Sequence, residues 1–361
     1  MTKFPEGRAI VYCEGAFGTP NGKTAHGLVR RTRRYRVLSV VDSRNDGKDA
    51  GEVLDGKPCG IPIYASLDRA IGEAVSGPGP ATHLVIGLAP DGGRLSTEAR
   101  DAVQRAISAG LDVDSGLHDF LSEDPVIASL AMDCGVRLRD VRKPPPRRAL
   151  HFFSGRIEEV DSLRIALLGT DSAVGKRTTA WVLVDALEAA GHTAELIGTG
   201  QTAWMQGVRH GIILDSLVND FVAGEIEHVI WSCWKDSRPN VMVLEGQGSL
   251  MNPAYPGGME LLAAGRPHAV ILQHAPARKH YDGFPGHPMH SLEKQIRAIE
   301  VLSEKPVVAV TLNHEDLTPS QVREECKRIR KSTGLPTVDV MVDGASELVR
   351  AVLPLLATVK A

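Results

Sequence analysis

Short apolar runs alternate with helical stretches along the first part of the chain. Runs rich in Val, Ile and Leu are typical of strands, and they lie at residues 8–13, 35–42, 61–64, 83–88 and 111–113. Pro62 has no N–H for a β-ladder, so the third run predicts an edge strand. Between the last two runs, apolar residues recur at helical spacing from about Ser96 to Gly110. Because strands that alternate with helices pair in parallel, this pattern predicts a parallel α/β sheet.

The same alternation returns in the second part. After its last predicted strand, Thr318, Pro319 and Gln321 match a capping box, which predicts a helix. Gly334 is the expected end of that helix. A final helix is predicted to bury Leu348, Val349, Val352 and Leu356. The predicted strands of this part lie at residues 163–168, 194–197, 241–244, 269–272 and 307–310.

A proline-rich segment separates the two parts. Pro144, Pro145 and Pro146 hold the chain in an extended path that neither a helix nor a central strand adopts. The length of 361 residues also suits two domains better than a single core. We therefore predict a first domain at residues 1–145, a linker at 146–160 and a second domain at 161–361.

A loop bounded by glycines follows the first strand of the second domain. It consists of Gly169, Thr170, Asp171, Ser172, Ala173, Val174, Gly175, Lys176, Arg177, Thr178 and Thr179. Backbone N–H groups, a helix N-terminus and a lysine ammonium together bind phosphate in loops of this type. We predict that these residues bind a phosphate group. The predicted fold is thus α/β, with two Rossmann-like parallel-sheet domains, the second of them P-loop NTPase-like.

The loop departs twice from the usual P-loop sequence. Five residues instead of four separate its glycines, and Arg177 stands between the lysine and the first hydroxyl, that of Thr178. The hydroxyl that holds Mg²⁺ in P-loop enzymes is therefore displaced by one position, which weakens an ATP-cleaving interpretation. A plain turn rich in glycine and serine is the alternative.

The five-residue spacing resembles the dethiobiotin synthetase branch of P-loop proteins, whose loop also begins Gly-Thr-Asp. A second stretch, Glu245-Gly246-Gln247-Gly248, follows a predicted strand and is similar to the Val-Glu-Gly-Ala-Gly stretch of that family. A carboxylate at the carboxyl edge of a strand can bind Mg²⁺ or act as a general base. Glu245 could also be only a capping acid.

A series of motifs along most of the chain resembles one bacterial and archaeal family. The characterised members of that family are D-glutamate N-acetyltransferases that use acetyl-CoA. In this sequence, Asn252 and residues 286–290 depart from the usual sequence pattern of the family. The motifs lie at residues 13–18 with 22–24, 50–56, 169–179, 198–202, 245–250, 252–255 and 278–283.

The first domain also resembles the CoA-binding Rossmann domain of succinyl-CoA synthetase. A strand, a glycine turn, a strand that ends near Asp42 and the segment 60–66 follow one another in the same order. Between them lies a group of arginines, which are either contacts for the phosphates of CoA or a solvated basic face. These arginines are Arg30, Arg31, Arg33, Arg34 and Arg36.

The family resemblance implies transfer of an acetyl group to an amine. This reaction needs a general base, because the ammonium must lose a proton before it attacks. Glu245 is the predicted base, and His280 is a second catalytic candidate. Cys13 and Cys233 adjoin apolar runs and are more typical of core thiols than of nucleophiles.

Cations are expected for the two carboxylates of such a substrate. Arg278 and Lys279 follow a predicted strand at the edge where open α/β sheets bind ligands, and they are predicted to bind the substrate. Gln201 and Thr202 are predicted to bind it too, beside the phosphate loop. An exposed pair of loop residues is the alternative for Arg278 and Lys279.

Composition narrows the range of partners. The net charge of −3, from 41 basic and 44 acidic residues, favours neither nucleic acid nor a membrane surface. The 5 cysteines form no CxxC pair, and the histidines near position 280 lack metal-binding spacing, so we expect reduced thiols and no tightly bound metal. Residues 1–8 show no apolar signal segment, and no window approaches about 18 apolar residues. We expect a cytoplasmic homo-oligomer, by default a homodimer, whose partners are small molecules.

The favoured function is an acyltransferase that moves the acetyl group of acetyl-CoA to the amino group of D-glutamate, as the family resemblance implies. The loop at residues 169–179 would hold the phosphates of the acyl donor. One alternative is an ATP- and Mg²⁺-dependent ligase or kinase that resembles dethiobiotin synthetase. Another is a nucleotide-sensing module that is not an enzyme.

Overall fold

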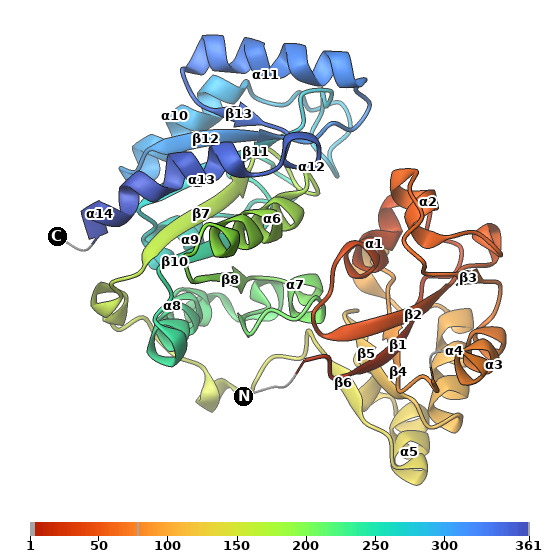
Figure 1. Ribbon diagram of the computed structural model, residues 1–361. Coiled ribbons are helices and arrows are strands. Elements are labelled where there is room, and N and C mark those ends of the chain that lie inside the picture. The colour runs from red at the N-terminus through yellow and green to blue at the C-terminus, as the bar shows by residue number, and fades with distance from the viewer. Residues whose placement is uncertain (1–3, 78, 360–361) are drawn as a thin grey trace. The chain divides into compact units, whose positions relative to one another are not determined.

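The fold is described from a computed structural model, which covers residues 4–77 and 79–359 (Figure 1). The chain divides into two compact units, and the division falls between Pro144 and Pro145, inside the proline run. The segment Gln201–Arg209 belongs to the first unit, although it follows the first strands of the second unit in sequence. No helix in the described ranges is both long and apolar enough to cross a bilayer.

The first unit contains a six-stranded parallel sheet in the order β3-β2-β1-β4-β5-β6. This is the strand order of dinucleotide-binding Rossmann sheets, and the predicted fold class is confirmed here. The short strand that contains Ile63 lies at the edge, as the neighbouring proline predicted. The elements are β1 Gly7–Tyr12, α1 Lys23–Arg30, β2 Tyr35–Val41, α2 Ala50–Asp55, β3 Ile63–Tyr64, α3 Leu67–Ser76, β4 His83–Ile86, α4 Thr97–Ser108, β5 Asp112–Ser115, α5 Pro125–Cys134 and β6 Leu138–Asp140.

A short helix from later in the chain completes the core of the first unit. This helix, α7 (Gln201–Met205), buries Met205 among the apolar residues around α1. The Thr202 hydroxyl bonds to the Thr24 hydroxyl at 3.0 Å. Just beyond the helix, the Gln206 amide donates to the carbonyl oxygen of Gly27 at 2.8 Å. The first unit is therefore assembled from two separate stretches of sequence.

The second unit contains a seven-stranded parallel sheet in the order β13-β12-β11-β7-β10-β8-β9. The parallel arrangement predicted for this half is also confirmed. The elements are β7 Leu163–Gly169, α6 Lys176–Ala189, β8 Ala194–Gly198, β9 His210–Gly211, α8 Asn219–Ser237, β10 Val241–Glu245, α9 Met259–Gly265, β11 Ala269–His274, α10 Leu292–Ser303, β12 Val307–Leu312, α11 Pro319–Thr333, β13 Thr337–Val338, α12 Val340–Asp343, α13 Ser346–Val352 and α14 Leu356–Val359.

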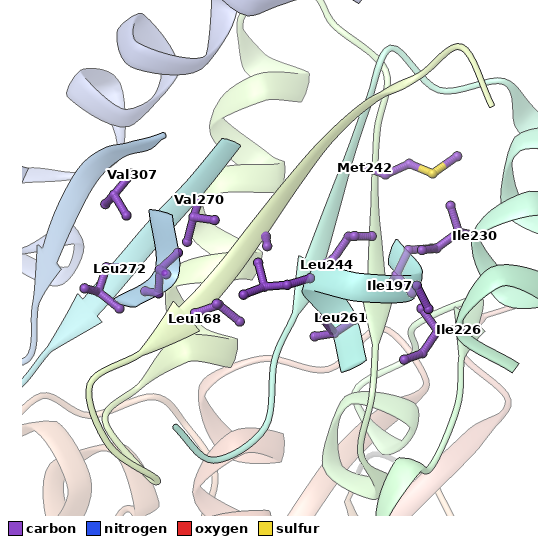
Figure 2. Close-up of a cluster of buried hydrophobic side chains, with 14 of the residues drawn as sticks. Leu168, Ile197, Ile226, Ile230, Met242, Leu244, Leu261, Val270, Leu272 and Val307 are labelled. Atoms are coloured by element: carbon purple, nitrogen blue, oxygen red, sulfur yellow. The ribbon is translucent and has the colours of Figure 1, made fainter. Parts of the chain in front are cut away.

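The core of the second unit fixes the strands from which the site projects (Figure 2). Alternate residues of β7, β10 and β11 point to one face of the sheet, where they meet α8 and α9. Full burial of each large aliphatic side chain contributes about 1.5–3 kcal/mol. The labelled members of this cluster are Leu168, Ile197, Ile226, Ile230, Met242, Leu244, Leu261, Val270, Leu272 and Val307.

Two helix predictions near the C-terminus have different outcomes. The capping box of α11 is present, with Thr318 and Gln321 bonded reciprocally to each other's backbone, and Gly334 ends the helix. The predicted single final helix is wrong, because α13 and α14 are separated by a 3₁₀ turn that contains Pro354. Proline cannot donate the hydrogen bond that would continue the helix. Leu356, predicted to be buried, is only partly buried.

Candidate functional site

The phosphate loop begins at the carboxyl edge of the second sheet. It leaves β7 at Gly169, and β7 lies between β10 and β11 in the sheet. In the strand register, Glu245 of β10 pairs with Leu167. On the other side, Gln273 of β11 pairs with Gly169. Three strand ends therefore meet at the edge where open parallel sheets bind ligands.

The two glycines of the loop have distinct roles. A Cβ atom on Gly169 would lie 2.8 Å from the Lys176 Nζ and 2.9 Å from the carbonyl oxygen of Asp171, so a side chain there would displace the lysine. Gly175 enters α6 with a φ of 97°, and no side chain in the described structure caps this helix. The N–H groups of a first helical turn have no intrahelical acceptors, so an anion at this loop can accept their hydrogen bonds.

The ammonium of Lys176 is buried within the loop. Its Nζ donates to the carbonyl oxygens of Asp171 and Gly248, each at 2.8 Å. Burial lowers the pKa of this lysine to about 8, although the charges of Glu245 and Asp171 oppose the shift. These two contacts use two of the three N–H donors of an ammonium. The third can bind an oxygen of a ligand.

The loop after β10 is shaped to supply one of those carbonyl oxygens. Gly248 has a φ of 53°, in the left-handed region that favours glycine. A Cβ atom on Gly248 would lie only 2.0 Å from the carbonyl oxygen of Tyr255. The glycine-rich stretch after Glu245 therefore positions a backbone acceptor for Lys176 as well as the carboxylate itself.

Glu245 is a buried carboxyl at the end of β10. Burial raises its pKa above the ordinary value, and the positive charges of Arg177 and Lys176 oppose this shift. Thr199, which follows β8, donates its hydroxyl to the Glu245 carbonyl oxygen at 2.8 Å and fixes the strand end. A buried carboxylate whose pKa is raised accepts a proton more readily than an ordinary glutamate.

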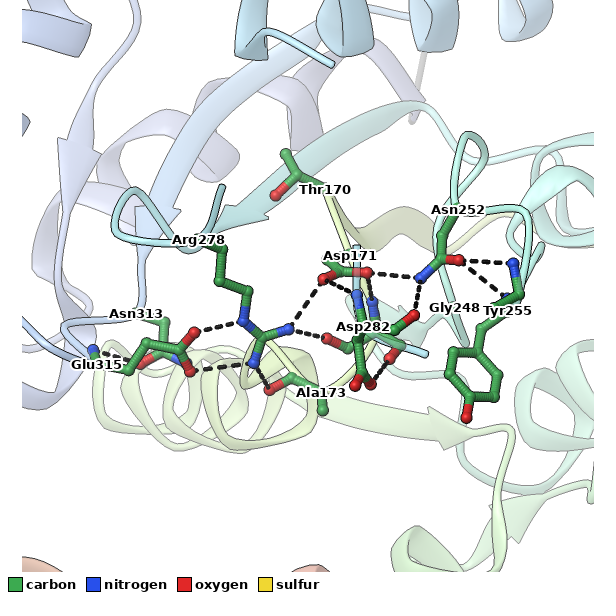
Figure 3. Close-up of polar contacts among 12 residues, drawn as sticks. Thr170, Asp171, Ala173, Gly248, Asn252, Tyr255, Arg278, Asp282, Asn313 and Glu315 are labelled. Atoms are coloured by element: carbon green, nitrogen blue, oxygen red, sulfur yellow. Dashed lines mark hydrogen bonds and ion pairs between the residues drawn. The ribbon is translucent and has the colours of Figure 1, made fainter. Parts of the chain in front are cut away.

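Asp171 organises the loop from the inside (Figure 3). Its buried carboxylate accepts hydrogen bonds from the Ser172 N–H and the Asn252 amide, both at 2.7 Å. Its second oxygen accepts from the Asp282 N–H and the Arg278 guanidinium, both at 3.0 Å. Asn252 also donates to the carbonyl oxygen of Asp282 at 3.0 Å. One acid of the loop thus joins it to the segments that follow β10 and β11.

Arg278 braces the outside of the same loop. Its guanidinium donates to the Asp171 carboxylate and to the carbonyl oxygens of Ser172, at 2.7 Å, and Ala173, at 3.3 Å. The remaining donors form a two-point contact with the Glu315 carboxylate. Ala173 has a φ of 50°, which is uncommon for a residue with a side chain. In this arrangement a substrate carboxylate could bind Arg278 only by displacing Glu315 or a group of the loop.

The hydroxyls of the loop differ in what they contact. Thr179 donates to the buried Gln273 side chain at 2.6 Å, so its hydroxyl is turned into the sheet. Thr170 bonds to His274 at 3.0 Å, and burial lowers the pKa of that histidine to about 4. Ser172 donates to the Asp282 carboxylate. Of the two threonines after the lysine, Thr178 is the one whose hydroxyl suits a ligand or metal contact.

The remaining candidates are not members of this network. Lys279 and His280 are exposed on the segment after β11, where the backbone of His280 pairs with Pro288. Within the described contacts, neither side chain is bonded to the loop or to Glu245. Gln201 and Thr202 lie in α7, which belongs to the first unit. The roles predicted for these four residues stay predictions.

No group of three or more His, Cys, Asp or Glu side chains in residues 4–77 and 79–359 is arranged to hold a metal ion. The arrangement can nevertheless do two things chemically. Lys176 and the helix start can bind an anion, and Glu245 can exchange a proton close to it. These properties are independent of any metal.

Sequence reasoning missed the residues that hold the loop in shape. Asn252 was noted only as a departure from the family wording, and it bonds directly to Asp171. Asp282 and Gly248 lie in stretches that carry the family resemblance, but the sequence predicts no role for them or for Glu315. Their partners are distant in sequence, so no local pattern signals the contact. The positions of the segments after β10 and β11, at the carboxyl edge, were the available indication.

Comparison with known families gives two matches along the chain. Residues 151–349 match the model described as "Domain of unknown function (DUF1611_C) P-loop domain". Residues 43–144 match the model described as "Domain of unknown function (DUF1611_N) Rossmann-like domain". Both descriptions agree with the two sheets and with the loop.

Among similar proteins, two carry the name D-glutamate N-acetyltransferase. The one from Tritonibacter scottomollicae is 33% identical over 277 residues, which are 75% of this chain and 81% of that protein. The one from Pseudoalteromonas sp. is 29% identical over 277 residues, which are 74% of this chain and 80% of that protein. A crystal structure of a DUF1611 family protein from Anabaena variabilis superimposes with a TM-score of 0.88 at 28% identity, over 97% of this chain and 100% of that one.

Proposed function

The chain belongs to the DUF1611 family, and from this premise we propose that it is an acyltransferase that transfers the acetyl group of acetyl-CoA to the amino group of D-glutamate. The names of two relatives support the N-acetylation of D-glutamate. The observation that carries the proposal in this chain is the buried Lys176 ammonium in a loop that opens onto an uncapped helix start. Such a site binds phosphate, and acetyl-CoA carries several phosphate groups.

The reaction sets clear requirements for the protein. The amine nitrogen forms a C–N bond to the acetyl carbon as the thioester C–S bond breaks. One proton must leave the ammonium before attack, and a second leaves the nitrogen as the amide forms. The departing thiolate gains one of the two, so one proton is released overall. Lys176, the N–H groups at the start of α6 and Thr178 would hold phosphate groups of acetyl-CoA. Arg278, Asp171 and Asn252 would keep the loop in the shape that binds them.

The closeness of Lys176 and Glu245 limits what Glu245 can do. The lysine charge acts on the carboxyl strongly enough to oppose the rise of its pKa. In acetyl-CoA, however, an extended pantetheine arm separates the phosphates from the thioester. If Lys176 holds a phosphate, the thioester of the same molecule lies far from Glu245. We therefore propose that Glu245 tunes the charge of the phosphate site and that the proton is taken up elsewhere.

The juxtaposition of the two groups also favours a second arrangement. An α-amino acid carries its carboxylate and ammonium on the same carbon, and these two groups would match Lys176 and Glu245 in charge. In that case the loop would bind D-glutamate instead of the donor, and Glu245 would be the base predicted from the sequence. The overall reaction is the same in both arrangements.

Product analysis tests the reaction, and Glu245→Gln distinguishes the arrangements. The wild type is expected to form N-acetylglutamate from D-glutamate and acetyl-CoA, and to form no such product with ATP and Mg²⁺ in place of the donor. The absence of the acetylated product would overturn the proposed function. If the loop holds the donor, Glu245→Gln should change kcat by less than about tenfold; as a general base, its loss should lower kcat by about 10²–10⁴-fold.

A further inference from the structure

A hollow lies beside α11 and α13 in the second unit, and its lining residues are not those of the phosphate loop. Its volume is about 360 Å³. A second hollow of about 480 Å³ shares three lining residues with it, Arg330, Glu347 and Arg350. In Figure 1, α11 covers the end of the second unit at which β13 forms the sheet edge.

Basic side chains from two helices line the first hollow. Arg323, Lys327 and Arg330 follow one another at helical spacing along a single face of α11. Arg350 of α13 faces the same space. The acidic residues among the lining groups are Asp343 and Glu347. Four cations against two carboxylates leave a net positive charge in this hollow.

Only one of these cations has its charge engaged by the protein. Arg330 donates to the carbonyl oxygen of Thr337 at 2.7 Å and pairs with Glu347 at 2.7 Å. In the part of the chain that the structure describes, Arg323, Lys327 and Arg350 form no hydrogen bond or ion pair. Elsewhere on α11, by contrast, Arg328 pairs with Glu325. The unmatched charge is thus concentrated on the face of α11 that lines the hollow.

The thiol in the hollow does not offset this charge. Cys326 lies between the cations on α11 and is mostly buried. Burial raises the pKa of its thiol to about 11, so the group is neutral at pH 7. The four cations and two carboxylates of the lining thus leave two positive charges, which a bound anion would balance.

We propose that this hollow is a second anion site, which binds a small molecule with at least two negative groups, either phosphates or carboxylates. Arg330, held by Thr337 and Glu347, would present a fixed guanidinium to one anionic group. Arg323, Lys327 and Arg350 would close around the others. A volume of about 360 Å³ lies at the lower end of the usual range for ligand pockets. The ligand is therefore a compact polyanion and not a macromolecule.

Calorimetric titration with inorganic pyrophosphate and with citrate tests this site. Lys176→Ala protein is used so that the phosphate loop does not contribute to the signal. We expect at least one of the two anions to bind. Removal of two cations, as Arg323→Gln with Lys327→Gln, should weaken that binding by about tenfold or more. Lys331→Gln, on the same helix but outside both hollows, removes a cation of the same helix and should leave the affinity unchanged.

The two probes identify the chemistry of the ligand. Binding of pyrophosphate alone assigns the site to phosphate compounds, and binding of citrate alone assigns it to polycarboxylates. If neither anion binds at millimolar concentration, or if the double variant binds as tightly as its parent, the proposal is overturned. If Lys176→Ala does not fold, the number of pyrophosphate molecules bound per chain is measured on the wild type instead. The Arg323→Gln, Lys327→Gln variant of the wild type must then bind one molecule fewer.

Discussion

The two sheets begin in the same way, with a strand, a turn that contains glycine, and a helix, but the two turns use their backbone donors differently. After β1, the Gly15 N–H donates to the buried Asp42 carboxylate at 3.0 Å. The same carboxylate accepts from the Arg44 N–H at 3.2 Å and from the Asn45 amide at 2.9 Å. Asp42, which directly follows β2, thus takes up the backbone donor of this turn, and we call the turn closed.

The turn after β7 keeps donors for a ligand, and we call it open. Its acid, Asp171, also accepts one N–H of its own turn, that of Ser172, but it binds Asn252 and the Arg278 guanidinium on neighbouring segments as well. Lys176 lies inside the turn, and the helix start that follows has no side-chain cap within the described residues. The positive end of this helix and the ammonium therefore act at the same place.

The contrast shows that strand order alone does not locate an anion site. The first sheet has the order of a dinucleotide-binding domain, yet the Gly15 donor is already bonded to the protein. The Gly15 N–H is therefore unavailable to a phosphate, whereas the second turn offers one the Lys176 ammonium and the N–H groups at the start of α6. The predicted resemblance of the first domain to CoA-binding domains stays a prediction, and its sheet has the strand order of dinucleotide-binding domains.

The largest effect is expected when the second turn loses its cation. Lys176→Ala should weaken binding of acetyl-CoA by about 10- to 100-fold, since a hydrogen bond to a charged group contributes roughly 1.5–3 kcal/mol. Calorimetric titration with acetyl-CoA, and in parallel with D-glutamate, measures this directly. A selective loss of D-glutamate binding would assign the loop to the amino acid.

Asp42→Asn is the matched variant in the first turn. This substitution should lower the midpoint temperature of thermal unfolding. A buried carboxylate that accepts three hydrogen bonds is replaced by an amide with one acceptor oxygen. The affinity for acetyl-CoA should not change. If Asp42→Asn weakened the donor as much as Lys176→Ala did, the distinction between the two turns would be wrong.

A smaller effect is expected from the brace of the second turn. Arg278→Lys should weaken acetyl-CoA by roughly 3- to 10-fold, because a lysine cannot contact Asp171, two loop carbonyl oxygens and Glu315 together. The KM for D-glutamate should change less than the affinity for the donor. Kinetics in which each substrate is varied in turn separate the two effects.

Lys331→Gln provides the control for this variant. Lys331 is exposed on α11, so its replacement removes a cation of the second unit without changing the loop. It should leave the affinity for acetyl-CoA and the KM for D-glutamate as they are. An increase confined to the KM for D-glutamate in Arg278→Lys would instead show that Arg278 faces the substrate, as the sequence predicted.

The contrast between the two turns also shows which features of the structure could be predicted from the sequence. Apolar runs predicted the parallel strands, because buried strands and amphipathic helices leave local patterns. The loop was recognisable for the same reason, since its glycines, lysine and threonines are contiguous. The engagement of Gly15 by Asp42 was not recognisable, because the two residues are 27 positions apart and lie together only through the pairing of β1 with β2.

The role of Arg278 shows the same limit. Its position after β11 correctly indicated the ligand edge of the sheet, but its partners Asp171 and Glu315 are 107 and 37 positions away. A guanidinium that suits a substrate carboxylate suits a carboxylate of the protein equally well. Residue type and spacing therefore could not decide between these partners.

The smallest expected effect comes from pH and follows from the burial of Lys176. In the free protein its pKa is lowered to about 8, so the ammonium is charged below that pH and loses its proton as the pH rises through it. A bound phosphate stabilises the charged form, so binding above pH 8 must take up a proton. The affinity for acetyl-CoA should be constant near pH 7 and fall by a few-fold between pH 7.5 and 9.5, at most about tenfold per pH unit.

Titration in two buffers of different ionisation enthalpy measures the proton uptake, and Lys176→Ala should show neither the uptake nor the decline. A wild-type affinity that stays flat to pH 9.5 would mean that the ammonium does not meet the donor, and the open turn would then have lost the feature that distinguishes it from the closed one.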